Sequence, residues 1–260
     1  AQQTSGEPGR DATYLFMRGR GTLNSAAPII LVDGVERELT SIDPNEVETV
    51  SILKDASSTA LFGVRGANGV ILVTTKRGTE TTPTISFTAE TGFQTFTRWP
   101  SQVDGYNWAT LKNQAWKNDN PHPEVNDAPP YSDYALERFR LQDWPEVYPN
   151  NNWRDKLMNT WVPQTRYNLN LNGKGGNVAY FVNVGFLDQR GQWKIDPSVT
   201  DYDPTQFMKR YNFRSNIDAT LNKSKTLKTF LNASGYLEKV NGPNASSPEI
   251  VDRMLSYWPT

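Results

Sequence analysis

Cysteine is absent from the 260 residues, and the single histidine, His122, lies between two prolines. Without thiols the chain has no disulfide, thiolate metal site or cysteine nucleophile, and one histidine supplies neither a histidine metal cluster nor a Ser-His-Asp triad. Carboxylate pairs such as Asp201 with Asp203, or Glu46 with Glu48, are expected to be solvated. The loop from Asp196 to Asp203 is conceivable as a calcium site but lacks a full set of ligands. We therefore predict no enzyme activity, no catalytic residue, no cofactor and no metal site.

Charge of one sign and long apolar runs are scarce too. The formal net charge is −1, and no basic block is present that would attract nucleic acid by bulk electrostatics. No run approaches the roughly 18 apolar residues that a membrane helix needs. The strands of a membrane β-barrel, however, alternate apolar and polar residues and leave only a weak hydropathy signal. The hydrophobic content of 37% is ordinary for a folded protein.

The segment from Pro28 to Gly78 predicts a compact unit of strands and short helices. Its three β-branched runs are Ile29–Val32, Thr49–Leu53 and Val70–Thr75. Asp33-Gly34 predicts a turn after the first run. Asp43 is typical of a helix N-cap, with Pro44 at the first helical position and Glu46 completing a capping box.

The glycines at positions 63, 66 and 69 raise the question of a phosphate-binding loop. Asp55 is expected to cap a helix over residues 56–62 that Gly63 ends. Nucleotide fingerprints need a helix whose N-terminus meets the phosphate, whereas a strand follows Gly69. We therefore interpret residues 65–69 as a tight, hairpin-like reversal in which Gly66 or Gly69 has a positive φ.

Several short motifs follow one another in this unit. They are Phe16-Met17-Arg18-Gly19-Arg20-Gly21, Leu31-Val32-Asp33-Gly34-Val35, Ile52-Leu53-Lys54-Asp55-Ala56-Ser57, Phe62-Gly63-Val64-Arg65-Gly66-Ala67-Asn68-Gly69-Val70-Ile71 and Thr74-Thr75-Lys76-Arg77-Gly78. In order and spacing they resemble the plug domain of the SusC/RagA family, which are TonB-dependent outer-membrane transporters of Bacteroidetes. Phe62 and Val64 stand where the family more often has a tyrosine and a small polar residue. The resemblance assigns a structural or gating role to Asp33, Gly34, Lys54, Asp55, Gly63, Arg65, Gly66, Asn68, Gly69, Lys76 and Gly78.

The resemblance implies a fold and a set of partners. The fold is an α+β plug domain, residues 1–82, followed over residues 83–260 by antiparallel transmembrane strands of an incomplete β-barrel, about 22 strands when complete. The function implied is TonB-dependent import of a nutrient, a glycan in preference to an oligopeptide, across the bacterial outer membrane. The partners implied are a SusD-like surface lipoprotein, TonB-ExbB-ExbD through an N-terminal segment, outer-membrane lipid and the nutrient ligand, with no nucleic acid; two transporter–lipoprotein pairs can form a dimer. Residues 1–11 show no signal peptide, so we expect the exported protein to begin upstream.

Beyond Pro83, apolar and polar residues alternate with a period of two. The apolar sets are Ile85, Phe87, Ala89 and Phe93; Tyr167, Leu169 and Leu171; Val178, Tyr180, Val182, Val184 and Phe186; Tyr211, Phe213, Ile217, Ala219 and Leu221; and Leu227, Leu231, Ala233 and Leu237. A soluble sheet with one wet face would produce the same alternation.

The lengths of the links favour a barrel. Long links, at residues 95–164, 189–209 and 240–260, alternate with short ones at 174–177 and 223–226. Short periplasmic turns and long external loops are typical of outer-membrane barrels, so we expect the long links to be extracellular. Ile217 and Leu221 should face lipid, and Asn216 and Asp218 should face the lumen, where Asn216→Arg is expected to be tolerated.

Aromatic residues concentrate in the first long link. A helix over residues 105–116 is predicted to place Trp108, Leu111 and Ala115 on one side. The candidate contacts to ligand or partner are Trp99, Trp108, Trp116 and Trp144, because an indole offers a flat apolar face and a polar edge. Packing of the link into its own small core is the alternative, and we weight it more heavily. Candidates for an interfacial aromatic girdle are Tyr167, Tyr180, Tyr211 and Tyr236.

Two functions from different classes fit these patterns. One is an energised outer-membrane importer. The other is a soluble or surface-attached β-rich module that binds glycan or protein without transport. An importer should require detergent for extraction and carry a SusD-like lipoprotein with it, whereas a module should be soluble alone. The plug motifs favour the importer.

Overall fold

The structure is a computed structural model that describes residues 2–3, 6–9, 13–14, 27–55, 59–122, 127–194, 198, 201, 204–222, 224, 226–243 and 247–256. The chain forms two compact units: residues 1–93, 163–191 and 207–241 make one, and residues 94–162, 192–206 and 242–260 make the other. The predicted Arg-Gly strand at residues 16–21 and most of the loop from Asp196 to Asp203 lie outside the described residues.

A four-stranded sheet forms near the N-terminus of the first unit, and we call it the N-terminal sheet. Its strands are β3 (Ile29–Val32), β4 (Val35–Glu36), β5 (Val47–Leu53) and β6 (Val70–Thr75), in the order β4-β3-β6-β5. The three predicted strands are therefore confirmed. Val32, Ile71 and Val73 form its buried core, because β-branched side chains pack well on a pleated surface. Two further short strands, β1 (Gln2–Gln3) and β2 (Thr13–Tyr14), pair with each other.

The turns of the N-terminal sheet confirm some predictions and correct others. Asp33 and Gly34 both have positive φ, 49° and 87°, as a two-residue hairpin between β3 and β4 requires. The 3₁₀ turns η1 (Leu39–Ser41) and η2 (Pro44–Glu46) precede β5, and Asp43 caps η2 by accepting from the backbone N–H of Asn45 at 2.8 Å.

The segment before β6 differs in part from its prediction. Residues 56–58, the first part of the predicted helix, lie outside the described residues, and from Ala60 the chain forms a 3₁₀ helix, η3 (Ala60–Asn68). This helix is interrupted at Gly63, where φ is 58° and where the sequence predicts a helix end. Residues 65–68 are therefore helical and do not form a hairpin-like reversal. The direction changes at Gly69, which has a φ of 94° and donates its N–H to the carbonyl of Gly66 at 2.9 Å. Of the two glycines proposed to hold a positive φ, Gly69 is the one that does.

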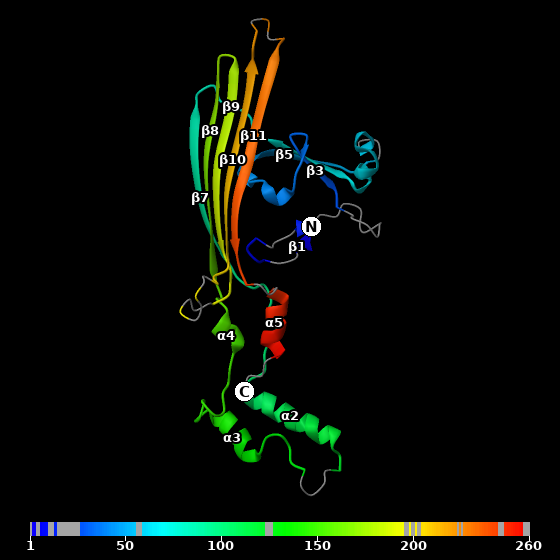
Figure 1. Ribbon diagram of the computed structural model, residues 1–260, viewed down its shortest axis with the longest axis vertical. Helices are drawn as coiled ribbons and strands as arrows, with labels where there is room; N and C mark the ends of the chain where they lie inside the picture. Colours follow the sequence, from blue (N-terminus) through cyan, green and yellow to red (C-terminus); the bar gives the residue numbers. More distant parts are fainter. Residues whose placement is uncertain are drawn as a thin grey trace. The chain divides into compact units, whose positions relative to one another are not determined.

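Five long antiparallel strands follow and form the strand wall. They are β7 (Thr84–Gln94), β8 (Val162–Gly175), β9 (Val178–Arg190), β10 (Phe207–Thr220) and β11 (Lys228–Asn241), and they lie side by side in sequence order (Figure 1). Short links join β8 to β9 and β10 to β11, and longer links join β7 to β8 and β9 to β10. These are the strands and the alternation of links that the sequence predicts.

The register separates two faces of the wall. Tyr211 lies opposite Phe186 on one side and Leu237 on the other, while Asn216 lies opposite Phe181 and Asn232. The first face, which we call outward, carries the predicted apolar sets. An aromatic row crosses it, in which the rings of Phe87 and Tyr167, Tyr167 and Phe186, and Phe186 and Tyr211 have centroids 6.2, 6.3 and 4.8 Å apart. Tyr236 does not join this row, because it pairs with Asn212 on the inward face.

The second unit is built from the longer links. Its helices are α2 (Gly105–Asp119), α3 (Asp133–Leu141), α4 (Trp153–Leu157) and α5 (Ser247–Ser256). Helix α2 is confirmed, but its buried side carries Gly105, Ala109 and Asn113, whereas Leu111 is 57% exposed. In the part of the chain that the structure describes, no helix is both long and apolar enough to cross a membrane.

Candidate functional site

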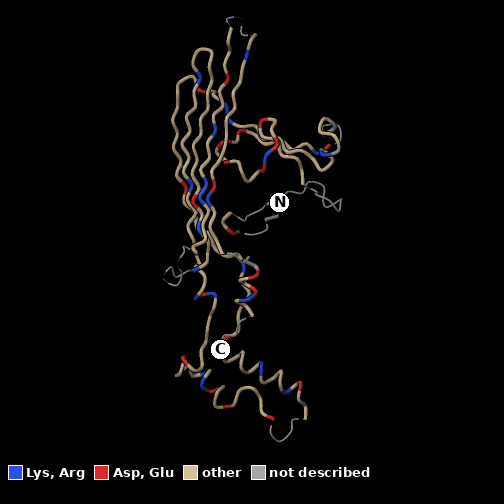
Figure 2. The backbone as a smooth tube through the Cα atoms, in the orientation of Figure 1, with Lys and Arg blue, Asp and Glu red and all other residues tan. Residues whose placement is uncertain are grey.

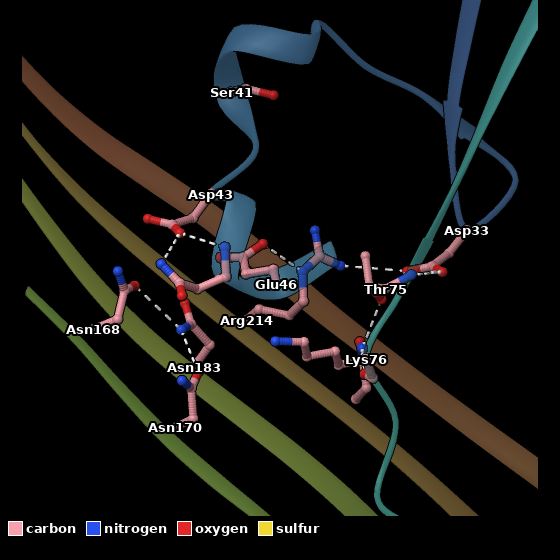
Figure 3. A network of polar contacts seen from close by, with 12 residues as sticks. Asp33, Ser41, Asp43, Glu46, Thr75, Lys76, Asn168, Asn170, Asn183 and Arg214 are labelled. Atoms are coloured by element: carbon pink, nitrogen blue, oxygen red, sulfur yellow. Dashed lines mark hydrogen bonds and ion pairs between the residues drawn. The ribbon is translucent and has the colours of Figure 1, made fainter. Parts of the chain in front are cut away.

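The N-terminal sheet meets the inward face of the strand wall through a buried charged network. Arg214 of β10 donates from Nε to Oε2 of Glu46 at 2.6 Å, and its Nη1 lies 3.5 Å from Oδ2 of Asp33. The side chains of Arg214, Glu46 and Asp33 are only 4%, 4% and 8% exposed. Figure 3 shows the guanidinium of Arg214 between Glu46 on one side and Asp33 with Thr75 on the other. One wall residue therefore joins two segments of the N-terminal sheet.

Burial affects the protonation of Glu46. It raises the pKa of the Glu46 carboxyl above its ordinary value, while the hydrogen bond and charge of Arg214 lower that pKa in part. Glu46 was expected to be solvated and to complete a capping box; instead it is buried against a partner 168 positions along the chain. Removing one partner from a buried ion pair leaves an uncompensated charge and costs about 3–5 kcal/mol.

A chain of hydrogen bonds extends the contact beyond Arg214. Thr75 donates from its backbone N to Asp33 Oδ1 at 3.0 Å and from Oγ1 to Asp33 Oδ2 at 2.5 Å. Asn216 then donates from Nδ2 to Thr75 Oγ1 and to the carbonyl of Lys76, both at 2.8 Å. Asn216 does face inward, as predicted, but it is 1% exposed, so the expected tolerance of Asn216→Arg is wrong while the N-terminal sheet occupies this position.

Residues 76–80 run across the wall between the N-terminal sheet and β7. Arg77 donates to Asp218 Oδ1 at 2.8 Å and to Asn232 Oδ1 at 3.0 Å, and the backbone N of Thr79 donates to Asn172 Oδ1 at 3.0 Å. A Cβ on Gly78 would stand 2.3 Å from the backbone N of Tyr180 and 2.4 Å from the carbonyl O of Gly173. Glycine is required here because backbone meets backbone.

The inward face is rich in asparagine as well as in charged residues. Asn183 of β9 donates from Nδ2 to Asn170 Oδ1 at 2.6 Å and to Asn168 Oδ1 at 3.4 Å, and Asn168 and Asn183 are both buried. Neutral amides can both donate and accept, so this surface can make hydrogen bonds to polar groups of either kind.

Comparisons with known proteins show what the sequence and the fold are similar to. Residues 1–70 match the TonB-dependent Receptor Plug Domain. Over 248 residues the chain is 31% identical to TonB-dependent receptor P26 of Formosa agariphila, covering 92% of this chain and 22% of that protein. It is 29% identical over 198 residues to TonB-dependent receptor SusC of Bacteroides thetaiotaomicron, covering 72% of this chain and 17% of that protein. The structure of the RagAB peptide transporter superposes with a TM-score of 0.71 at 23% identity, over 92% of this chain and 27% of that one.

Over most of its length the chain is similar to the SusC/RagA-like TonB-dependent receptors. It spans about a fifth of the length of the curated relatives it matches. The N-terminal sheet is thus part of the plug, and the strand wall is part of an incomplete barrel. The resemblance and the fold class predicted from the sequence are confirmed.

The plug-motif residues fall into two groups in this structure. Asp33, Lys76 and Gly78 lie at the contact between plug and wall. The others lie elsewhere: Gly34 in the β3–β4 hairpin, Lys54 and Asp55 after β5, and Gly63, Arg65, Gly66, Asn68 and Gly69 in or beside η3. Arg65 makes an ion pair with Glu36 in which both side chains are largely exposed. Pairs of that kind contribute little stability.

The four candidate tryptophans of the first long link are not brought together. Trp99 packs edge-on against Phe96 at 4.9 Å, and Trp144 is 55% exposed. Trp116 accepts hydrogen bonds from Asn120 through its backbone carbonyl. Trp108 instead lines a pocket of about 260 Å³ together with Trp153, Gln102 and Asn151.

Part of the link does pack into a core of its own. Phe139 of α3 is buried, and the rings of Tyr131 and Tyr148 meet it edge-on at 5.7 and 5.2 Å. The internal-packing role therefore holds for these aromatic residues, which were not among the four candidates.

Sequence reasoning missed Arg214, Thr75 and the role of Glu46. Arg214 occurs on the polar side of an alternating strand, where arginine is unremarkable when read alone. The sequence does contain one signal. Asn212 and Asn216 lie two positions before and after Arg214 on the same face of the strand, which predicts that its side chain points inward but does not predict its partner.

Proposed function

We propose that the chain forms the plug and first barrel strands of an importer that takes up a nutrient across the bacterial outer membrane, driven by TonB. The observation that supports this proposal is the contact that Arg214 of the strand wall makes with the plug. Its pairs to Glu46 and Asp33 are buried polar contacts, and the hydrogen bonds from Asn216 to Thr75 and Lys76 extend them. These contacts hold the plug against the wall and keep the pore closed. They can break together when TonB pulls the plug.

The same proposal places the chain and its partners. The strands lie in the outer membrane, with the plug and short links toward the periplasm and the links at residues 95–164, 189–209 and 240–260 outside. A SusD-like lipoprotein rests on those outer links, and TonB-ExbB-ExbD acts through an N-terminal segment. The division into a plug at residues 1–82 and a barrel segment at 83–260 belongs to this proposal.

The cargo we favour is an oligosaccharide, with an oligopeptide as the second candidate. The pocket formed by Trp108, Trp153, Gln102 and Asn151 supports the first, because indole faces suit sugar rings and amides suit hydroxyl groups. The likeness to RagAB supports the second, since that protein is a peptide transporter.

Uptake by cells tests the function directly. The full-length receptor gene would be deleted and restored, and growth measured on a defined oligosaccharide mixture as carbon source and on an oligopeptide mixture as nitrogen source. The proposal expects one of the two to depend on the receptor and on TonB together. Growth that needs the receptor but not TonB, or a receptor that extracts without detergent, would favour the binding-module alternative.

A further inference from the structure

The outward face of the strand wall carries a cluster of basic side chains that the import proposal does not use. Arg190 of β9 lies opposite Phe207 of β10, and Lys209 of β10 lies opposite Lys239 of β11. All four share the outward face with Tyr211, because positions two apart along a strand point to the same side. We call Arg190, Phe207, Lys209 and Lys239 the basic patch.

The pairing within the patch is unfavourable without a counter-charge. Lys209 and Lys239 are direct cross-strand partners, and like charges placed opposite each other destabilise a sheet. Asp188 lies opposite Lys209, but its ion pair is with Arg190, at 3.5 Å. Among the described residues, no carboxylate lies within ion-pair distance of either ammonium group. Three cations therefore share one carboxylate.

The ring of Phe207 lies close to both Lys209 and Lys239. Their ammonium groups lie 5.6 and 5.8 Å from the centre of its ring, which is only 9% exposed. The lysine stems can lie along apolar surface while the charged ends reach outward. The ring contributes a modest attraction to each cation, but it brings no negative charge.

Within the patch, Lys209 and Lys239 lie one outward position beyond the aromatic row, and Arg190 and Phe207 lie two, at the end of the strands from which the longer links leave. One outward position corresponds to about 7 Å along a strand. Figure 2 shows charged residues gathered toward this end of the strands. Aromatic residues mark the level where membrane hydrocarbon meets headgroups, so the patch stands at headgroup level on the lipid-facing side.

We propose that the basic patch binds the phosphate of a phosphorylated glycolipid in the outer leaflet. This inference rests on the membrane placement in the proposed function. A phosphate supplies the missing negative charge and several acceptor oxygens. The acyl chains of the same lipid would lie along the apolar outward residues below the patch, such as Tyr211 and Phe213. Free phosphate has no such second contact, which favours the lipid.

The test uses the full-length receptor purified in detergent and titrated with phosphorylated lipid A, with bound lipid counted by native mass spectrometry. Lys209→Gln/Lys239→Gln should weaken binding by roughly tenfold per lysine, as for hydrogen bonds to charged groups. The matched control, Lys174→Gln/Lys228→Gln, removes the same charge from two exposed lysines at the short-link ends of β8 and β11, which the register places on the inward face. It should bind like wild type. Dephosphorylated lipid A should bind weakly to all three proteins, and excess inorganic phosphate should not displace the lipid.

Each other outcome overturns the proposal. Unchanged affinity in the Lys209/Lys239 variant, or equal affinity for the dephosphorylated lipid, refutes phosphate binding at the patch. Displacement by inorganic phosphate identifies a free-anion site instead. Loss in the Lys174/Lys228 control means that the effect comes from net charge and not from the basic patch. Nutrient uptake measured in the same strains reports on the import proposal separately, since a wild-type receptor that binds lipid but imports nothing refutes import alone.

Discussion

Replacing Arg214 by methionine removes the cation that joins plug and wall while keeping much of the side chain's apolar volume. Glu46 then loses its 2.6 Å partner in a site where its side chain is 4% exposed, and Asp33 keeps only the hydrogen bonds from Thr75. The cost is about 3–5 kcal/mol, which corresponds to roughly two to four orders of magnitude in the equilibrium between docked and released plug. We expect the pore to leak without TonB.

The assay is sensitivity of whole cells to a glycopeptide antibiotic too large for general porins, with receptor level and barrel folding checked by heat-modifiability on gels. The control is Arg77→Met, which breaks a partly exposed pair with Asp218 and should cost only about 0–1 kcal/mol. Adding Glu46→Gln and Asp33→Asn to Arg214→Met should restore part of the barrier, because no buried charge is then left alone. A folded Arg214→Met receptor that excludes the antibiotic as well as wild type does would refute the reasoning.

Three further changes test other parts of the structure. Gly69→Val forces a β-branched residue to a φ of 94° and should destabilise the plug by about 1–3 kcal/mol, lowering uptake while the barrel still folds; equal plug stability in urea would contradict this. Ile217→Arg, on the outward face, should impair assembly by about 2–4 kcal/mol near the membrane midplane, whereas Ile217→Thr should assemble, and heat-modifiability measures both. Because the docked plug raises the pKa of Glu46, its protonation stabilises docking fully below about 4.5, and this contribution is lost as pH rises through the raised pKa. The urea concentration that releases the plug should therefore fall with rising pH in wild type but not in Glu46→Gln.

The strands were predictable from the sequence because their signal is local. Apolar residues two apart, such as Phe213 and Tyr211, identify an outward face within a single strand, and the link lengths give the order of strands. The hairpin at Asp33-Gly34 was predictable for the same reason, since the two residues themselves favour positive φ.

The contact between plug and wall was not predictable in this way. Arg214 and Glu46 are 168 positions apart, and no periodicity relates a 3₁₀ turn to a barrel strand. The sequence instead favoured a local role for Glu46, the capping box, and tertiary burial overrode it. The same holds for Gly66, where a Cβ would stand 2.7 Å from the carbonyl O of Thr59. That tight packing arises from a helical turn where a reversal was predicted.

Our central claim is that the plug must separate from the wall during import. A reversible disulfide between plug and wall tests it most directly. The sequence has no cysteine, so Thr75→Cys/Asn216→Cys introduces its only two cysteines. In the docked plug the side chains that they replace are in contact, with Asn216 Nδ2 2.8 Å from Thr75 Oγ1. The reduced variant must first import at a measurable rate, and each single variant controls for oxidation alone. We predict that oxidation abolishes uptake by the double variant and that a reductant restores it. Uptake that continues unchanged with the disulfide fully formed would contradict a mechanism in which the plug separates from β10.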